Sequence, residues 1–178
     1  SNVAQYTYIE PPKKPVRPVL IANAGGKQGE TLSGSVKEHV LTGTTSDKIE
    51  GLKYYIFNND VCSGADSYEK IERAEANNEV IAKGDVANQA FRLTVKDANS
   101  GVKNKYSAIT VNSKVVGTCS NVVQYTYTEP PKKPVAPVIL ANAEGKKGQT
   151  ISGSVKEHVI SATTSDKIEG LKYYIFNN

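Results

Sequence analysis

The two cysteines, Cys62 and Cys119, have the clearest chemistry in this sequence, because a pair of thiols can oxidise to a disulfide. Such a bond would close a loop of about 58 residues and stabilise the folded state by roughly 4 kcal/mol in the chain-entropy model. One pair per domain is typical of proteins in an oxidising, extracellular setting. Two separate buried thiols are the alternative. We therefore predict a structural disulfide between Cys62 and Cys119 and a secreted or cell-surface location.

The two histidines, His39 and His158, stand in identical VKEHV segments. A metal centre needs several ligands in one place, and a catalytic triad needs a nucleophile beside its base. Neither histidine has a second histidine or a cysteine nearby in the sequence. We interpret both as partly exposed loop residues, and we predict no catalytic residue, no metal site and no cofactor. An enzyme is not expected.

The segment Asp97–Gly101 (DANSG) carries oxygen-bearing residues of the kind found in calcium loops. It lacks the later acidic ligands and the bidentate glutamate that such a loop needs. Asp, Asn, Ser and Gly are also the residues that turns select. We predict a turn at this segment, and the same interpretation applies to Asp60 and Asp66.

Aromatic and basic side chains offer candidate binding surfaces. Tyrosines could stack on sugars, although tyrosines that alternate along a strand are more often half-buried packing residues. Lys13 and Lys14 could contact an anionic surface, or they could simply keep a linker solvated. The tyrosines in question are Tyr6, Tyr8, Tyr54, Tyr55 and their later copies.

The composition favours β-strands and excludes some function classes. There are ten Tyr, no Met and no Trp, with Gly, Pro, Asn and Ser between the apolar runs. The net charge is only +4, with Lys and Glu interspersed, which argues against nucleic-acid binding. No apolar run is long enough to cross a bilayer, so no membrane insertion is expected. The first residues, SNVAQYTY, do not resemble a signal peptide, and we expect them to lie inside a longer array.

The sequence contains a long internal repeat. Residues 1–59 return as residues 120–178 with twelve differences, which sets a period of 119 residues. Several differences are apolar swaps of similar volume, which cores tolerate, and others fall in a turn. The segment PPKKP occurs at 11–15 and again at 130–134. Proline cannot donate to a strand ladder, so PPKKP reads as a semi-rigid, extended linker.

Alternating and apolar runs predict the strands of one period. The segment 37–48 is polar and turn-rich, and the segment 68–76 (YEKIERAEA) could be a short helix or an edge strand. A turn is expected at 23–26. The expected strands are 2–9, 16–22, 30–36, 52–57, 79–82, 90–95, 106–111 and 121–127.

Three segments carry a resemblance to a known family, and a fourth departs from it. Ile49–Tyr55 (IEGLKYY) is similar to strand C of fibronectin type III or immunoglobulin-like domains of bacterial surface proteins, and Ser120–Pro131 is similar to strand G running into a linker. Tyr106–Asn112 (YSAITVN) resembles strand F, with Tyr106 where a corner tyrosine would stand. Thr31–Ser35 takes the place of strand B without the family's usual Trp. The resemblance implies an all-β, antiparallel β-sandwich of seven strands.

The resemblance also fixes the expected domains. Residues 1–14 would be the last strand of a preceding repeat plus linker, residues 15–133 one complete repeat, and residues 134–178 strands A to C of the next. In a simple sandwich the two cysteines lie near opposite ends, so residues 112–119 must double back along the sheet. Similar domains contain Lys–Asn cross-links, for which Lys53 and Asn112 are the candidates here.

The predicted function is that of a structural spacer repeat in a secreted or cell-surface bacterial adhesin, stalk or fibre. Its partners would be neighbouring copies of the same repeat. One alternative is a module in which each repeat binds a glycan or a host protein. Another is a fibre subunit that assembles by strand exchange between chains.

Overall fold

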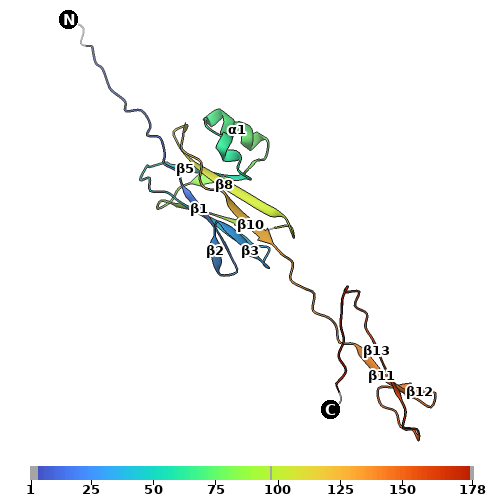
Figure 1. Ribbon diagram of the computed structural model, residues 1–178. Helices are drawn as coiled ribbons and strands as arrows, with labels where there is room; N and C mark the ends of the chain where they lie inside the picture. Colours follow the sequence, from blue (N-terminus) through green and yellow to red (C-terminus); the bar gives the residue numbers. More distant parts are fainter. Residues whose placement is uncertain (1–3, 97, 177–178) are drawn as a thin grey trace. The chain divides into compact units, whose positions relative to one another are not determined.

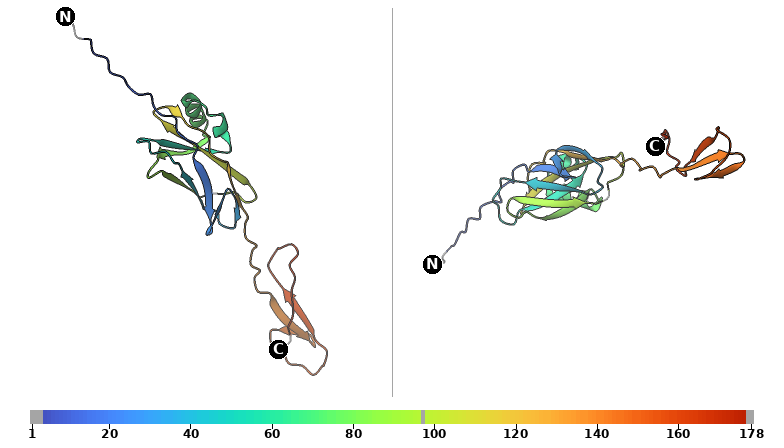
Figure 2. Two further views of the ribbon diagram at one scale, coloured as in Figure 1. Left: turned by 60° about the vertical axis from the view of Figure 1, so that its left-hand side comes forward. Right: turned by 90° about the horizontal axis from the view of Figure 1, so that it is seen from below.

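The structure is a computed structural model that describes residues 4–96 and 98–176 (Figure 1). It divides the chain into two compact units, Ser1–Pro130 and Pro131–Asn178, with the boundary inside the second PPKKP segment. The fold is mostly β, with several antiparallel sheets. Residues 4–14 run as an extended segment outside the sheets (Figure 2).

The first unit contains a four-stranded antiparallel sheet in the order β2-β1-β4-β7. A tight turn joins its first two strands, and Gly25 and Gly26 supply the positive φ angles of 55° and 78° that this turn requires. The strands of this sheet are β1 (Val19–Ala24), β2 (Lys27–Gly29), β4 (His39–Thr44) and β7 (Ala90–Val95).

A second sheet has the order β3-β10-β8-β5-β6, with β9 on the end of β8. All its pairs are antiparallel except β3 with β10, which is parallel. Its strands are β3 (Thr31–Gly34), β5 (Lys53–Asn58), β6 (Val80–Asp85), β8 (Lys103–Asn112), β9 (Val115–Val116) and β10 (Val123–Tyr127).

The main core lies between these two sheets. Alternate residues of β10 point into it, since Val123, Tyr125 and Tyr127 are buried. Leu20 and Leu41 come from the first sheet, and both are fully buried in the same cluster. Burial of this apolar surface is the main driving force for folding.

A helical segment covers the other face of the second sheet. It consists of a 3-10 turn, η1 (Val61–Gly64), and a helix, α1 (Tyr68–Ala76), which lies over β5 and β8 (Figure 1). Ser67 caps the helix by accepting a hydrogen bond from the Lys70 amide, at 3.4 Å. Ile71 and Ala74, three positions apart, pack with Phe57 and Ile109 in a second core. The helical alternative for 68–76 is therefore the right one.

Two sequence predictions for the first sheet are wrong. Residues 37–48 were expected to be a turn-rich connection, yet β4 lies within them and pairs with both β1 and β7. Residues Thr31–Ser35 do not take the place of strand B, because β3 joins the other sheet beside β10. The strand within residues 37–48 was not predicted because the inward positions of β4 are His39, Leu41 and Gly43. This apolar pattern is weak, and only the surrounding aromatic rings complete it.

The second unit reproduces part of this arrangement. Its strands pair in the order β12-β11-β13, and Ala141 faces Gly148 as Ala22 faces Gly29 in the first unit. These strands are β11 (Val138–Ala143), β12 (Lys146–Gly148) and β13 (Val159–Thr163).

Two repeated sequences are strands in one context and not in the other. Segment LKYYIF contributes to β5 in the first unit, but residues 171–176 form no strand, and Phe176 is 84% exposed where Phe57 is fully buried. Likewise QYTY forms most of β10, whereas its first copy forms no strand and Tyr6 is 86% exposed. The strand predicted at 2–9 is wrong over its described part, residues 4–9, because these residues pair with no neighbouring strand.

Candidate functional site

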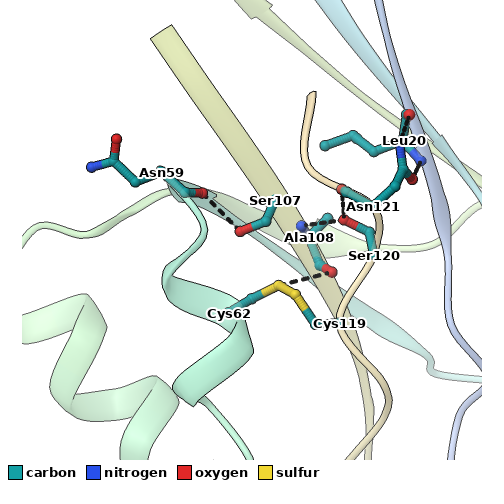
Figure 3. Close-up of a disulfide and its surroundings, with 8 residues drawn as sticks. All are labelled: Leu20, Asn59, Cys62, Ser107, Ala108, Cys119, Ser120 and Asn121. Atoms are coloured by element: carbon teal, nitrogen blue, oxygen red, sulfur yellow. Dashed lines mark hydrogen bonds between the residues drawn. A yellow bond between two sulfur atoms is a disulfide. The ribbon is translucent and has the colours of Figure 1, made fainter. Parts of the chain in front are cut away.

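A disulfide joins Cys62, in η1, to Cys119, in the segment before β10, with a Cα–Cα distance of 5.6 Å (Figure 3). That distance lies in the middle of the normal range for disulfides. Cys62 is almost fully buried among the side chains of the second core. The bond therefore links the helical layer to the segment before the last strand of the unit.

Both cysteines reach the middle of β8 because the chain turns back once after β5, at Asn59, and once after β8. After β8, residues Ser113 and Lys114 form a turn with positive φ, and the chain returns along β8 through β9. The Ser120 amide donates to the Ala108 carbonyl, and the Sγ of Cys62 lies 3.5 Å from the same oxygen. The doubling-back that the disulfide requires of residues 112–119 is thus present.

Polar side chains fix the segment that follows Cys119. The Ala108 amide donates to the Ser120 hydroxyl at 2.8 Å, and that hydroxyl donates to the Asn121 carbonyl. Asn121 accepts from the Leu20 amide at 2.9 Å and donates to the Leu20 carbonyl at 2.8 Å (Figure 3). Asn121 therefore ties the segment before β10 to β1. Sequence reasoning missed this role of Asn121. The one signal in the sequence is that the first copy of the repeat also has Asn at the corresponding position, Asn2.

The end of the first Pro-rich linker is bound to the unit that follows it. Pro15 is fully buried, and the Val16 amide donates to the carboxylate of Asp47, itself only 7% exposed, at 2.7 Å. On the other side, Asn112 donates to the carbonyl of Lys13 at 2.9 Å. A buried carboxylate that accepts a backbone N–H in this way is a strong, charge-assisted contact.

The second unit repeats this contact. The Val135 amide donates to the carboxylate of Asp166, again at 2.7 Å. We call the hydrogen bond from residue 16 or 135 to its aspartate the linker clamp. The clamp makes the last linker residues part of the following unit, a role that sequence reasoning did not assign to either aspartate.

His39 is 1% exposed and packs against the rings of Tyr106 and Tyr125, so its interpretation as a partly exposed loop histidine is wrong. Its Nε2 is 3.0 Å from the hydroxyl of Tyr106, and its ring stacks on Tyr125 at 4.2 Å. Burial lowers the pKa of His39, with the backbone of Lys37 acting in the opposite direction. Burial also raises the pKa of Tyr106 to about 12, so the pair is neutral at physiological pH.

The buried histidine predicts acid sensitivity of the first unit. Because the pKa of His39 is lower in the folded state, the unfolded chain binds a proton first as the pH falls below about 6.5. We expect the free energy of unfolding to decrease over this range, by at most about 1.4 kcal/mol per pH unit. Urea denaturation between pH 7.5 and 5 measures this slope.

His158 supplies the matched control, because it occupies the same sequence motif and is exposed. His158→Gln should keep the pH slope of the first unit, and His39→Gln should lose it. An unchanged slope in His39→Gln would show that another group controls the acid response.

The remaining candidates do not come together as a site. Asp66 is exposed and pairs with Lys70 one helical turn away, which lowers the pKa of the Asp66 carboxyl. Lys53 pairs with Asp85 at the surface, while Asn112 binds Lys13, so Lys53 and Asn112 are not arranged for a cross-link.

Among the residues that the structure describes, the acidic turn candidates and the tyrosines likewise do not form a site. Asp60 is exposed, and Asp97 lies outside the described residues, while Gly101 turns with a φ of 75° and donates to Tyr127. Tyr54 stacks on Phe91 at 4.6 Å, and Tyr55 is buried in the second core. The tyrosines of β5 are therefore packing residues rather than a stacking platform.

Within residues 4–96 and 98–176, no group of three metal-ligating side chains comes together, and no helix is long and apolar enough to span a membrane. A cavity of about 480 Å³ in the second unit is lined by Pro134, Val135, Leu171 and Tyr174. The counterparts Pro15, Leu52 and Tyr55 are buried in the first unit, so this cavity is an open core rather than a ligand pocket. A scan against protein-family models finds no match, and a search of curated proteins finds no relative.

Proposed function

We propose that residues 15–133 are one spacer unit of a tandem-repeat protein that is secreted or displayed on a bacterial surface, as a stalk or an adhesin arm. In this proposal the first unit is a β-sandwich of the fibronectin type III or immunoglobulin-like kind. The parallel pairing of β3 with β10 and the succession β4, β5, β7, β8 and β10 over two sheets support that comparison. The helical layer would be an addition to it.

The observation that carries the proposal is where the chain enters and leaves the first unit. Lys13 and Val16 contact Asn112 and Thr110, at the end of β8. The carbonyl of Tyr127, where β10 ends, accepts from Gly101, just before β8 begins. The chain therefore enters and leaves at opposite ends of a ten-residue strand, so each unit adds its full length to the path of the chain.

The setting is also part of the proposal. The disulfide supports an oxidising compartment such as the cell exterior. The linker clamp supports a mechanical role, because it holds each linker end on the unit that follows. No catalytic activity belongs to this proposal.

Proteins with one, two and three copies of residues 15–133 test the spacer role by small-angle X-ray scattering. A ten-residue strand spans about 34 Å. With a short Pro-rich joint, each added copy should lengthen the maximum dimension by roughly 50 Å.

The matched control replaces PPKKP at each joint with a Gly/Ser sequence of equal length, which should shorten the increment by making the joint flexible. A maximum dimension that barely grows from one copy to three would contradict the proposal.

Strand exchange between chains is the second candidate function. The residues QYTY at 5–8 repeat part of β10 and are exposed, so they can act as a donor strand. Residue 4 is Ala, however, where β10 has the fully buried Val123, so the β10 of the same chain fits its place better. Ala4→Val should raise the dimer fraction in size-exclusion chromatography if exchange occurs, and leave it unchanged if it does not.

A further inference from the structure

The sheet of the second unit has an open apolar face. Ile139 and Ile160 are 44% and 45% exposed, whereas their counterparts Leu20 and Leu41 are fully buried. In the first unit, β7, β8 and β10 supply the strands and side chains that cover this face. The first unit thus shows which kind of segment fits the second: a β segment of the type found at residues 60–128.

Ten positions differ between residues 15–59 and residues 134–178, and several of them, such as Leu20 and Leu41, are apolar swaps in the main core, whereas position 43 gains a side chain. Gly43 in β4 faces Phe91 in β7. Position 162, its counterpart, is Ala. A Cβ on residue 43 would lie 2.0, 2.2 and 2.6 Å from three atoms of the Phe91 ring, Cζ, Cε2 and Cε1.

The Phe91 ring has little freedom to avoid this contact. It is only 5% exposed and stacks face to face on Tyr54, with ring centroids 4.6 Å apart and planes at 9°. Overpacking of a closed core forces side chains off their rotamers or shifts the backbone. A Phe placed against Ala162 as Phe91 lies against Gly43 would therefore overpack that site.

We propose that the open face of residues 134–176 binds a β segment related to residues 60–128 that carries a side chain shorter than Phe where Phe91 stands. The residues at positions 43 and 91 then decide which N-terminal half of a repeat, such as residues 15–59 or 134–178, associates with which C-terminal half, such as residues 60–128. This inference rests on the proposed tandem-repeat function, because it concerns how neighbouring repeats of nearly the same sequence avoid each other.

This pairing rule would reduce mispairing between neighbouring repeats. Residues 60–128 are flanked by two nearly identical first halves, and mispairing between neighbouring repeats is a characteristic failure of repeat proteins. All but ten of the 45 positions in these halves are the same, so most contacts cannot discriminate between them. A methyl group placed against a buried ring discriminates by roughly tenfold or more in population.

The test appends residues 60–128 after Asn178 of the full chain, once unchanged and once with Phe91→Leu in the appended copy. Leucine lacks the three ring atoms that the added Cβ would meet. Each version is made with Ala162 and with Ala162→Gly. Hydrogen exchange of β11 and β13, free-thiol counting for a second disulfide and thermal unfolding report completion of the second unit.

With Ala162, the Leu version should complete the second unit and melt about 5–20 °C above the Phe version. With Ala162→Gly, the Phe version should also complete the second unit and regain the higher melting temperature. In the first unit, Gly43→Ala should lower the melting temperature by a similar amount, and Phe91→Leu should restore part of it.

The two proposals fail differently. If the appended segment orders equally well in all four proteins, and Phe91→Leu does not rescue Gly43→Ala, the pairing rule is wrong while the tandem array stands. If none of the four proteins orders the appended segment, the open face is not an acceptor, and the tandem-repeat function fails with it.

Discussion

Reducing the bond between Cys62 and Cys119 should about double the length of chain released when the first unit is pulled apart from its two ends. The bond joins residues 57 positions apart and shields the loop between them from the force. At about 3.5 Å per residue, less the folded length, an oxidised unit should release about 160 Å and a reduced unit about 360 Å. Single-molecule force spectroscopy measures these steps directly.

The double variant Cys62→Ser/Cys119→Ser is the matched control, because it should show the long step with or without reductant. It should also lose about 4 kcal/mol of equilibrium stability, mainly because its unfolded chain is less constrained. Equal step lengths before and after reduction would mean that the bond does not carry the load between the two ends.

Tyr125→Ala should destabilise the first unit by about 3–5 kcal/mol, whereas Tyr6→Ala should change its stability by less than about 0.5 kcal/mol. Tyr125 is fully buried, stacks on His39 and donates a hydrogen bond to the Val36 carbonyl at 2.5 Å. Tyr6 stands in the same QYTY sequence and is 86% exposed. Urea denaturation of both variants compares one residue type in two settings.

Tyr125→Phe separates the ring from its hydroxyl and should lose only about 1 kcal/mol, the net value of one hydrogen bond. A large loss of stability in Tyr6→Ala would mean that Tyr6 packs in the core of the first unit. That result would contradict the assignment of this place to β10.

Alternation and apolar runs were enough to locate most strands. The expected strand at 90–95 matches β7, and those at 52–57 and 106–111 match β5 and β8 within a few residues. These segments are rich in Val, Ile, Phe and Tyr and are bounded by turn residues, so local sequence determines them. The even number of cysteines likewise led to the disulfide.

Other features depend on contacts that a local pattern does not contain. Strand β4 was missed because His39 and Gly43 read as polar or flexible, yet Tyr125 and Phe91 cover them. The parallel partner of β3 lies about 90 residues further along the chain. The linker clamp was not predicted because an aspartate in a polar segment is most often solvated.

Absence of a partner explains the remaining errors. Residues 4–9 carry a strand pattern but form no strand, since a lone strand leaves its backbone groups unpaired and gains little burial. Periodicity shows that a segment is able to form a strand. It does not show whether a neighbour is there to receive it.

The order of strands in the second sheet has a consequence for biosynthesis. Strand β3 is made early, yet in that sheet it pairs, among the residues that the structure describes, with β10 alone, which closes the unit from residues 123–127. While the ribosome translates roughly 90 intervening residues, residues 31–34 of the nascent chain lack the partner with which they form β3, and Cys119 emerges just before that partner. The second sheet of the first unit therefore stays unfinished until residues 123–127 are made.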